Sequence, residues 1–414
     1  MISIQNLNKS LLAFLVIGFF SSFSTFAQLA PGSQVYILNE GTSGRKGSLG
    51  VVSSDTGVYQ HLDSVGAYGN ALLLSPTHLY VVNGYVEGNV LRYDLQNFNS
   101  QSVTPNLGAR GIAIYNNQLL VCGTVHPYFR VYDLATLNEV YHLDSTKVRS
   151  AREEVVVVNN KAYLSGYYGD TVVAVVDLAG QDFIKNIETA ENPYQLQVID
   201  DEVYIGCFTY NPDFTTNTTI HQVETATDLI TSTGVVQKAD GFTSDASKIY
   251  LKKSNGKILA YDPANQQVDT LSSFQGFYYG FGYDITTNLM FVSETDYVST
   301  GSVGYLDLSS GFSSSMISAD ISPRAFAYQA SPFSGIDNSL SKHYKLYPNP
   351  STGNIWVNVT EPTRLRIEDT QAKTIKELSV SNLSEINLAN YPKGLYIVHV
   401  FQDEKHWTEK LILQ

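Results

Sequence analysis

The feature that most constrains the fold is an internal repeat that runs from Gln34 to Ala330. Each unit has an apolar strand, a short polar turn, a second apolar strand, a loop, and a third strand that ends in an acidic residue. These acidic residues are Asp94, Asp133, Asp177, Glu224, Asp262 and Asp307, at successive spacings of 39, 44, 47, 38 and 45 residues. Because an aspartate after a strand commonly caps a tight turn with its side-chain oxygen, we interpret them as turn residues rather than as catalytic groups.

Periods of about 40–45 residues with about four strands per unit are typical of a β-propeller. The sequence therefore predicts an all-β fold. Five complete units span about residues 68–274, and a sixth runs from Tyr278 to about Ile317. Gln34–Leu38 and Arg324–Tyr328 are fragments of one further unit. Pairing these terminal strands would close a seven-bladed ring and remove its exposed sheet edges.

The N-terminus is typical of a secretory signal peptide covering residues 1–27. Lys9 precedes the apolar run Leu11–Phe20, and Thr25-Phe26-Ala27 places small residues where cleavage before Gln28 is expected. The alternative is a membrane anchor, but the run is about half the ~20 residues that a spanning helix needs. We expect no transmembrane segment in the mature chain.

Charge and cysteine content narrow the classes of partner. The chain has 39 acidic and 26 basic residues, a net charge of −13, which becomes −14 when Lys9 is removed with the signal peptide. Nucleic-acid binders carry basic patches, so the sequence predicts no nucleic-acid partner. Cys122 and Cys207 fall on equivalent strands of non-adjacent repeats, too far apart to bridge, and we expect two buried thiols.

The last 72 residues, 343–414, resemble a known export domain. They open with Tyr347-Pro348-Asn349-Pro350-Ser351-Thr352-Gly353, continue through Gly394-Leu395-Tyr396-Ile397-Val398, and end with Lys410-Leu411-Ile412-Leu413-Gln414. This order is similar to the C-terminal sorting domain of the type IX secretion system of Bacteroidetes. The resemblance implies contact with that machinery through 343–414 and a secreted or outer-cell-surface location.

The residues of this block also predict its fold. Short alternating strands such as Ile355–Val359, separated by Pro and Gly, are typical of a small Ig-like β-sandwich. An ordinary sandwich without a sorting role is the alternative. The Ser-rich segment 331–342 is the expected linker, which leaves 28–330 for the propeller.

A second resemblance covers the propeller, roughly residues 34–330. Leu38-Asn39-Glu40-Gly41 followed by Gly47-Ser48-Leu49, and Thr295–Val298 followed by Gly301–Tyr305, are similar to the first and last blades of YncE-like, surface-layer-type propellers of Bacteroidetes. Relatives in that group are lipid-anchored propellers that capture cobalamin with a transporter. This chain lacks the lipoprotein cysteine and carries a sorting domain instead, which departs from that branch.

Tyrosine and arginine gather in two sets of loops that share one face of a propeller. These residue types dominate binding hot spots, because Tyr offers a large amphipathic ring and Arg a rigid fork of donors. Packing between blades is the alternative role for each ring. The candidate ligand-binding residues are Glu40, Tyr85, Arg110, Tyr128, Arg152, Tyr168, Tyr194, Tyr210, Tyr279, Tyr297 and Arg324.

The sequence favours a non-enzymatic protein that binds an unknown small molecule or glycan outside the cell. We assign no catalytic residue, metal ligand or cofactor, and interpret the run from Lys252 to Lys257 as a solvated turn. One alternative is a metal-assisted lactonase- or lyase-type enzyme, in which Asn39, Glu40, Asn70 and Asp296 would converge on a hard cation. An adhesin or scaffold is another.

Overall fold

The computed structural model describes residues 29–30, 32–42, 44–84, 89–105, 108–330, 344–347, 351, 353–359, 362–369, 373–381, 383–402 and 405–413. These residues form strands and turns and contain no helix, as an all-β fold requires. The chain divides into two compact units, one up to Ala330 and one from Ser331. The predicted signal peptide and linker lie outside the described residues.

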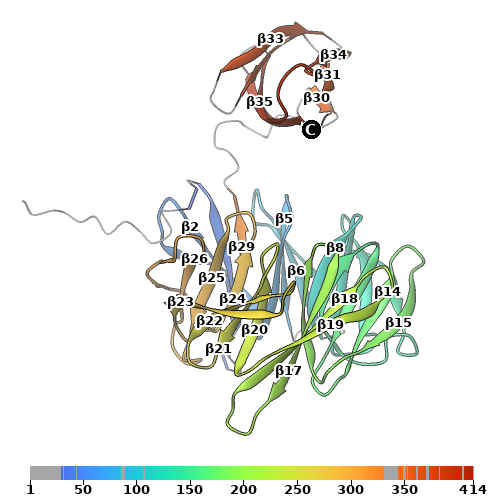
Figure 1. Ribbon diagram of the computed structural model, residues 1–414, viewed down its shortest axis with the longest axis vertical. Coiled ribbons are helices and arrows are strands. Elements are labelled where there is room, and N and C mark those ends of the chain that lie inside the picture. The colour runs from blue at the N-terminus through green and yellow to red at the C-terminus, as the bar shows by residue number, and fades with distance from the viewer. Residues whose placement is uncertain are drawn as a thin grey trace, which may run out of the picture. The chain divides into compact units, whose positions relative to one another are not determined.

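Seven antiparallel sheets make up the described part of the first unit (Figure 1). Their strands, in spatial order, are β29 (Pro323–Gln329), β1 (Gln34–Asn39), β2 (Gly47–Ser53) and β3 (Tyr59–Gly66); β4 (Gly69–Leu74), β5 (His78–Asn83), β6 (Asn89–Asp94) and β7 (Ser100–Val103); β8 (Ala109–Tyr115), β9 (Gln118–Gly123), β10 (Phe129–Asp133) and β11 (Glu139–Leu143); and β12 (Arg152–Val158), β13 (Lys161–Gly166), β14 (Val172–Asp177) and β15 (Asp182–Glu188).

The remaining three sheets follow the same order. They are β16 (Pro193–Ile199), β17 (Glu202–Tyr210), β18 (Thr216–Glu224) and β19 (Leu229–Val236); β20 (Ala239–Ser244), β21 (Ile249–Lys253), β22 (Lys257–Asp262) and β23 (Gln267–Gln275); and β24 (Phe281–Asp284), β25 (Leu289–Glu294), β26 (Ser302–Asp307), β27 (Phe312–Ser313) and β28 (Ile317–Ser318). The hairpin of β17 and β18 projects beyond its neighbours (Figure 1).

The first strand of each sheet contacts the first strands of the two neighbouring sheets. These contacts run from β4 through β8, β12, β16, β20, β24 and β29 and return to β4. We call these seven the inner strands. Such an arrangement of four-stranded antiparallel sheets is β-propeller-like.

The two ends of this unit meet in one sheet. Strand β29 pairs antiparallel with β1, with Gln34 opposite Gln329 and Leu38 opposite Ala325. Asp320, just before β29, accepts hydrogen bonds at one carboxylate oxygen from three side chains of the same sheet. These are Ser48 at 2.6 Å, Tyr59 at 2.9 Å and His61 at 2.8 Å.

Most sheets are covered on both faces. In β5, β9 and β13, every residue after the first is buried, although successive side chains of a strand point to opposite faces. Mixed clusters such as Leu120, Val131, Val155 and Leu164 fill the space between adjacent sheets. This double burial explains why charged residues make up only 16% of the chain.

The acidic residues of the repeat cap turns, as predicted. The Asp133 carboxylate accepts from the backbone N–H groups of Ala135 and Thr136, and Asp307 accepts from Ser309 and Ser310. The prediction for the cysteines is also confirmed, because both are buried and free, and burial raises the pKa of each thiol, to about 12 for Cys207.

In the second unit, two antiparallel sheets enclose one core. One contains β30 (Tyr344–Tyr347), β31 (Asn354–Val359) and β34 (Leu383–Asn387). The other contains β33 (Thr374–Val380), β32 (Thr363–Glu368), β35 (Gly394–Gln402) and β36 (Lys405–Leu413). Val357 and Ile386 from the first sheet share a buried cluster with Ile367 and Val398 from the second. Across the described residues of the chain, no helix has the length and apolarity to cross a membrane.

Candidate functional site

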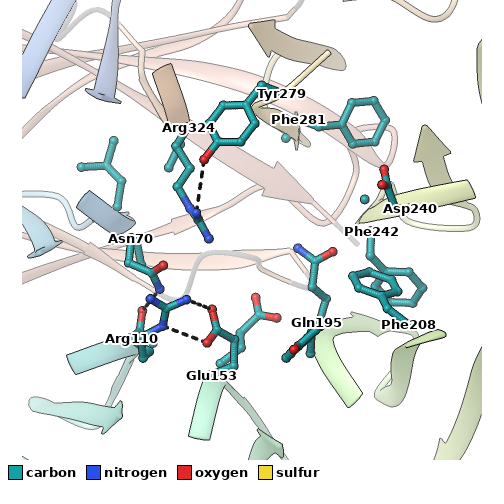
Figure 2. A pocket seen from close by; sticks show the side chains of 18 of the residues that line it. Asn70, Arg110, Glu153, Gln195, Phe208, Asp240, Phe242, Tyr279, Phe281 and Arg324 are labelled. Carbon is teal, nitrogen blue, oxygen red and sulfur yellow. Dashed lines mark hydrogen bonds and ion pairs between the residues drawn. The ribbon is translucent and has the colours of Figure 1, made fainter. Parts of the chain in front are cut away.

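A cavity of about 640 Å³ lies where the inner strands converge. Its size falls in the range of about 300–1,000 Å³ that is usual for small-molecule sites. All seven inner strands contribute lining residues from the end at which they enter their sheets. In Figure 2, Arg110 and Glu153 lie on one side of the open space and Tyr279 and Arg324 on another.

β-Bulges place polar side chains in this cavity. In β4, β8, β16 and β29, the pairing with the next strand skips one residue, which is Asn70, Arg110, Tyr194 and Arg324 respectively. All four line the cavity. A bulge re-aims a side chain that regular alternation would place in the sheet. Equivalent positions of four sheets thus supply the polar lining.

Arg110 forms a bidentate ion pair in the cavity. Its Nε and Nη2 atoms donate to the two carboxylate oxygens of Glu153 at 2.8 and 2.6 Å. The guanidinium also lies over the Tyr167 ring, 5.6 Å from its centroid. The backbone carbonyl of Arg110 accepts a hydrogen bond from the Asn70 side-chain amide at 2.6 Å. The two parallel hydrogen bonds and the cation–π contact favour the same orientation of the guanidinium plane, so together they hold it in place.

Arg324, Glu40 and Tyr279 form a second polar cluster. Arg324 Nη1 lies 3.2 Å from a Glu40 carboxylate oxygen and 3.4 Å from the Tyr279 hydroxyl, which itself donates to Glu40. Burial lowers the pKa of Arg324, but the charges of Glu40, Tyr279 and Glu153 together with the hydrogen bond to Glu40 outweigh it and hold that pKa above its usual range. The Tyr297 ring packs edge-on against Tyr279 with centroids 5.2 Å apart.

Lys252 reaches the cavity from β21, so its interpretation as part of a solvated turn is wrong. Its Nζ donates to the Tyr279 backbone carbonyl at 3.0 Å and lies 3.7 Å from a carboxylate oxygen of Asp240. Burial lowers the pKa of Lys252, and Asp240 offsets this only in part. Gly241, with φ +69°, leaves the space that Lys252 occupies, since a Cβ there would lie 2.7 Å from its Cε atom.

Glu154 adds a carboxyl group to the cavity wall. One of its oxygens accepts from the backbone N–H of Leu196 at 2.7 Å. Desolvation raises the pKa of Glu154 to about 8, and the Leu196 hydrogen bond counteracts only part of this rise. At neutral pH this side chain is therefore mostly protonated, and it offers a hydroxyl donor to the cavity.

Aromatic rings line another sector of the wall. Tyr194 packs edge-on against Tyr167 and Phe208, with centroids 6.3 and 5.9 Å apart. Tyr210 and Phe242 line the same cavity, and Phe208 and Phe242 lie next to each other in Figure 2. Burial raises the pKa of Tyr194, so its hydroxyl stays protonated. The wall thus combines apolar ring faces with neutral polar tips.

The predicted site residues separate into three groups. Those that line the cavity are Arg110, Tyr194, Tyr210, Tyr279 and Arg324. Glu40 and Tyr297 contact this group. The structure places the others elsewhere: Tyr128 packs on the core between two sheets, Tyr168 is exposed, Arg152 is buried within its own sheet, and Tyr85 lies outside the described residues.

Arg152 is the sharpest departure from expectation. It is fully buried, donates to the Val172 carbonyl at 3.0 Å and to Ser150 Oγ at 2.7 Å, and lies 3.5 Å from Asp170. In β12 the bulge comprises two residues, Glu153 and Glu154, which follow Arg152. These two glutamates therefore occupy the cavity and Arg152 stays inside the sheet.

The four residues proposed for a hard cation do not converge. Asn39 is buried and donates to Ser48 and Tyr59, and Asp296 accepts from the turn that follows it, at Val298 and Ser299. Glu40 and Asn70 make the cavity contacts given above. Among the residues that the structure describes, no cluster of three His, Cys, Asp or Glu is arranged to hold a metal ion.

Several cavity residues were not predicted from the sequence, namely Glu153, Glu154, Gln195, Asp240, Phe242, Lys252 and Phe281. The first four lie at or next to the start of an inner strand, as do the arginines that were predicted. They could have been found by selecting every residue at the start of an inner strand, whatever its type, and not Tyr and Arg alone.

Comparison with known proteins identifies the C-terminal segment. Residues 345–414 match the family model of the secretion system C-terminal sorting domain. This domain directs export by the type IX system, so the protein is secreted or held at the outer cell surface. No curated protein matches the chain.

Two solved structures are similar to the chain at low sequence identity. One is hydrazine synthase of Kuenenia stuttgartiensis, at 15% identity over 57% of this chain and 76% of that chain, with a TM-score of 0.49. The other is the computationally designed Ika8 protein, at 13% identity over 83% of this chain and 96% of that chain, with a TM-score of 0.47.

Proposed function

We propose that this protein is a secreted or surface-held seven-bladed β-propeller that binds a small molecule or glycan without chemically altering it. In this proposal β29 and β1 close the ring, and residues 1–27 and 343–414 act in export as signal peptide and Ig-like sorting domain. The first unit is related to the YncE-like, surface-layer-type propellers of Bacteroidetes. The circle of contacts among the inner strands supports the closed ring.

One observation carries the binding role. A cavity of ordinary ligand size is lined by all seven inner strands, and bulges at equivalent positions direct polar groups into it. Charged groups in a half-buried cavity lower the stability of the fold, because buried charge is poorly solvated. Their presence there therefore suggests a role other than stability. A ligand site is the purpose that this arrangement fits.

A thermal-shift screen of the full chain tests the proposal. Cobalamins, haem, glycans, siderophores and divalent metals form the panel, and a ligand at 100 times its Kd should add about 2.7 kcal/mol to the free energy of unfolding. Circular dichroism is the readout, since both tryptophans of the mature chain, Trp356 and Trp407, belong to the second unit and cannot report on the first.

A charge-neutral double variant locates the site. Arg110→Gln with Glu153→Gln removes both members of the ion pair without leaving either charge unpaired, and should weaken binding about tenfold or more. Arg149→Gln is the matched control, because Arg149 is exposed outside the cavity. If the double variant binds a confirmed ligand as tightly as the control does, the proposed site is wrong.

A further inference from the structure

The ionised side chains of the cavity are paired with one another. Each cation lies within ion-pair distance of one anion, and the pairs are Arg110–Glu153 at 2.6 Å, Arg324–Glu40 at 3.2 Å and Lys252–Asp240 at 3.7 Å. Three positive and three negative charges therefore cancel. An anionic ligand would have to compete with a carboxylate already in place, and a cationic ligand with a guanidinium or ammonium group. The site favours a ligand without net charge.

The polar groups that remain suit hydroxyls. Glu154 presents a carboxyl group, and the Asn70 and Gln195 amides lie beside the Arg110–Glu153 pair (Figure 2). Amides and protonated carboxyls each combine donors with acceptors over a short distance. A hydroxyl group also donates and accepts through one atom, so neighbouring hydroxyls match this lining better than a carbonyl or an ether does.

The aromatic wall suits the other side of a sugar ring. Tyr167, Tyr194, Phe208 and Phe242 form one sector of the lining. The face of an aromatic ring carries partial negative charge, and the C–H groups on one face of a pyranose carry partial positive charge. A ligand with an apolar C–H face and a hydroxylated edge therefore complements both parts of the wall.

Four exposed aromatic rings extend this surface beyond the cavity. Tyr168 is 71% exposed and follows the lining residue Tyr167. Phe214 is 100% exposed at the tip of the β17–β18 hairpin, between the lining residues Tyr210 and Thr216, and Phe277 is 76% exposed two residues before Tyr279. Tyr297, 56% exposed, packs against Tyr279. We call these four the rim rings.

We propose that the cavity and the rim rings form one binding surface for a neutral oligosaccharide chain, with a terminal sugar in the cavity and further sugars against the rim rings. This inference rests on the proposed binding function and specifies its ligand class. The rim rings stand on four separate loops, and each is close in sequence to, or in contact with, a residue that lines the cavity. Separate platforms fit a ligand built of repeated rings.

Glycan arrays followed by calorimetry on the full chain test this inference. The probes are neutral oligosaccharides from one to six units in several linkages, together with sulfated and uronic-acid counterparts of the same length. Neutral chains should bind, and chains long enough to contact the rim rings should bind more tightly than a mono- or disaccharide. Affinity should change little with salt, because no charges are being screened.

A matched pair of variants separates the rim from the cavity. Phe214→Ala should weaken binding of the longest neutral chain by about two- to tenfold and leave a mono- or disaccharide unaffected. Phe312→Ala removes another exposed phenyl ring, on β27 outside the cavity, and should have no effect on either ligand.

The outcomes distinguish this inference from the proposed function. Tighter binding of the anionic glycans would overturn the charge argument, and equal loss in both variants, or in neither, would overturn the role of the rim. If no neutral oligosaccharide binds while another ligand is lost in the Arg110→Gln, Glu153→Gln variant, the inference is wrong and the proposed site stands. If that variant binds every ligand normally, the proposed function fails as well.

Discussion

Replacing Glu154 by Gln removes the ionisable group that the cavity wall perturbs most clearly. Gln keeps a carbonyl oxygen that can accept the Leu196 N–H, so the hydrogen bond at 2.7 Å survives the change. What disappears is the titration. In the folded chain desolvation holds the pKa of Glu154 at about 8, against 4.5 for an ordinary glutamate.

The sign and size of the effect follow from proton linkage. Between these two pKa values the folded state keeps the proton and the unfolded state releases it, so the free energy of unfolding falls as the pH rises. A tenfold difference in proton affinity corresponds to about 1.4 kcal/mol. Between about pH 5 and pH 7, the contribution of Glu154 to the free energy of unfolding therefore falls by ~2.5 kcal/mol. Above about pH 8 both states are ionised and the loss is complete.

Denaturant unfolding at pH 5 and pH 7, followed by circular dichroism, measures this difference for the wild type and for Glu154→Gln. The pH dependence of all other groups cancels in the comparison, and the variant should become the more stable protein as the pH rises. Glu191→Gln, at an exposed glutamate, should leave the wild-type pH dependence unchanged. Parallel curves for the wild type and Glu154→Gln would refute the proposal that the cavity desolvates this carboxyl group.

Three further predictions concern packing, ring closure and the thiols. Gly111→Ala places a Cβ 2.7 Å from the backbone of β12 and should cost about 1–3 kcal/mol in denaturant unfolding, whereas Gly282→Ala, which also faces the cavity, has space for its methyl group and should cost less than half of that. Asp320→Asn weakens the acceptor of three hydrogen bonds where the chain ends meet and should lower the free energy of unfolding by about 1–3 kcal/mol. Cys122 and Cys207 should resist a thiol reagent until the chain unfolds, and rapid labelling of the native protein would contradict their burial.

The strands were predictable from the sequence because each repeat carries several independent sequence features. Apolar runs separated by polar turns recur together with an acidic turn residue, so an error in one unit is corrected by its neighbours. The pairing of the chain ends was also foreseen, since Gln34–Leu38 and Arg324–Tyr328 each lacked a partner. The signal peptide and the linker lie outside the described residues and stay predictions.

Part of the site was predictable because bulges recur at equivalent positions of the inner strands. Arg110, Tyr194 and Arg324 each occupy a one-residue bulge at the start of an inner strand, so their place in the repeat together with their residue type identified them. In β12, Arg152 pairs with Gly166 as Ala109 of β8 pairs with Gly123, so Glu153 and not Arg152 holds the position equivalent to Arg110. A register shift of this kind depends on pairing with β13, which no local pattern encodes.

Lys252 shows a second reason for failure. It reaches the cavity from a second strand, and it does so through space left by Gly241, a glycine in the left-handed region. The two residues are eleven positions apart on consecutive strands, and their contact depends on how β20 and β21 pair. A polar, glycine-containing stretch has the same local appearance whether it faces solvent or a cavity.

A structure of the full chain in complex with the tightest ligand from the screen tests the central claim most directly. The account predicts that the ligand lies in the cavity of the inner strands, within hydrogen-bonding distance of the Arg110–Glu153 pair or of Arg324. A second cavity, of about 450 Å³, lies at the opposite ends of β16, β20 and β24, beside Asp245 and Tyr283. A ligand found there, or on the second unit, would contradict the account.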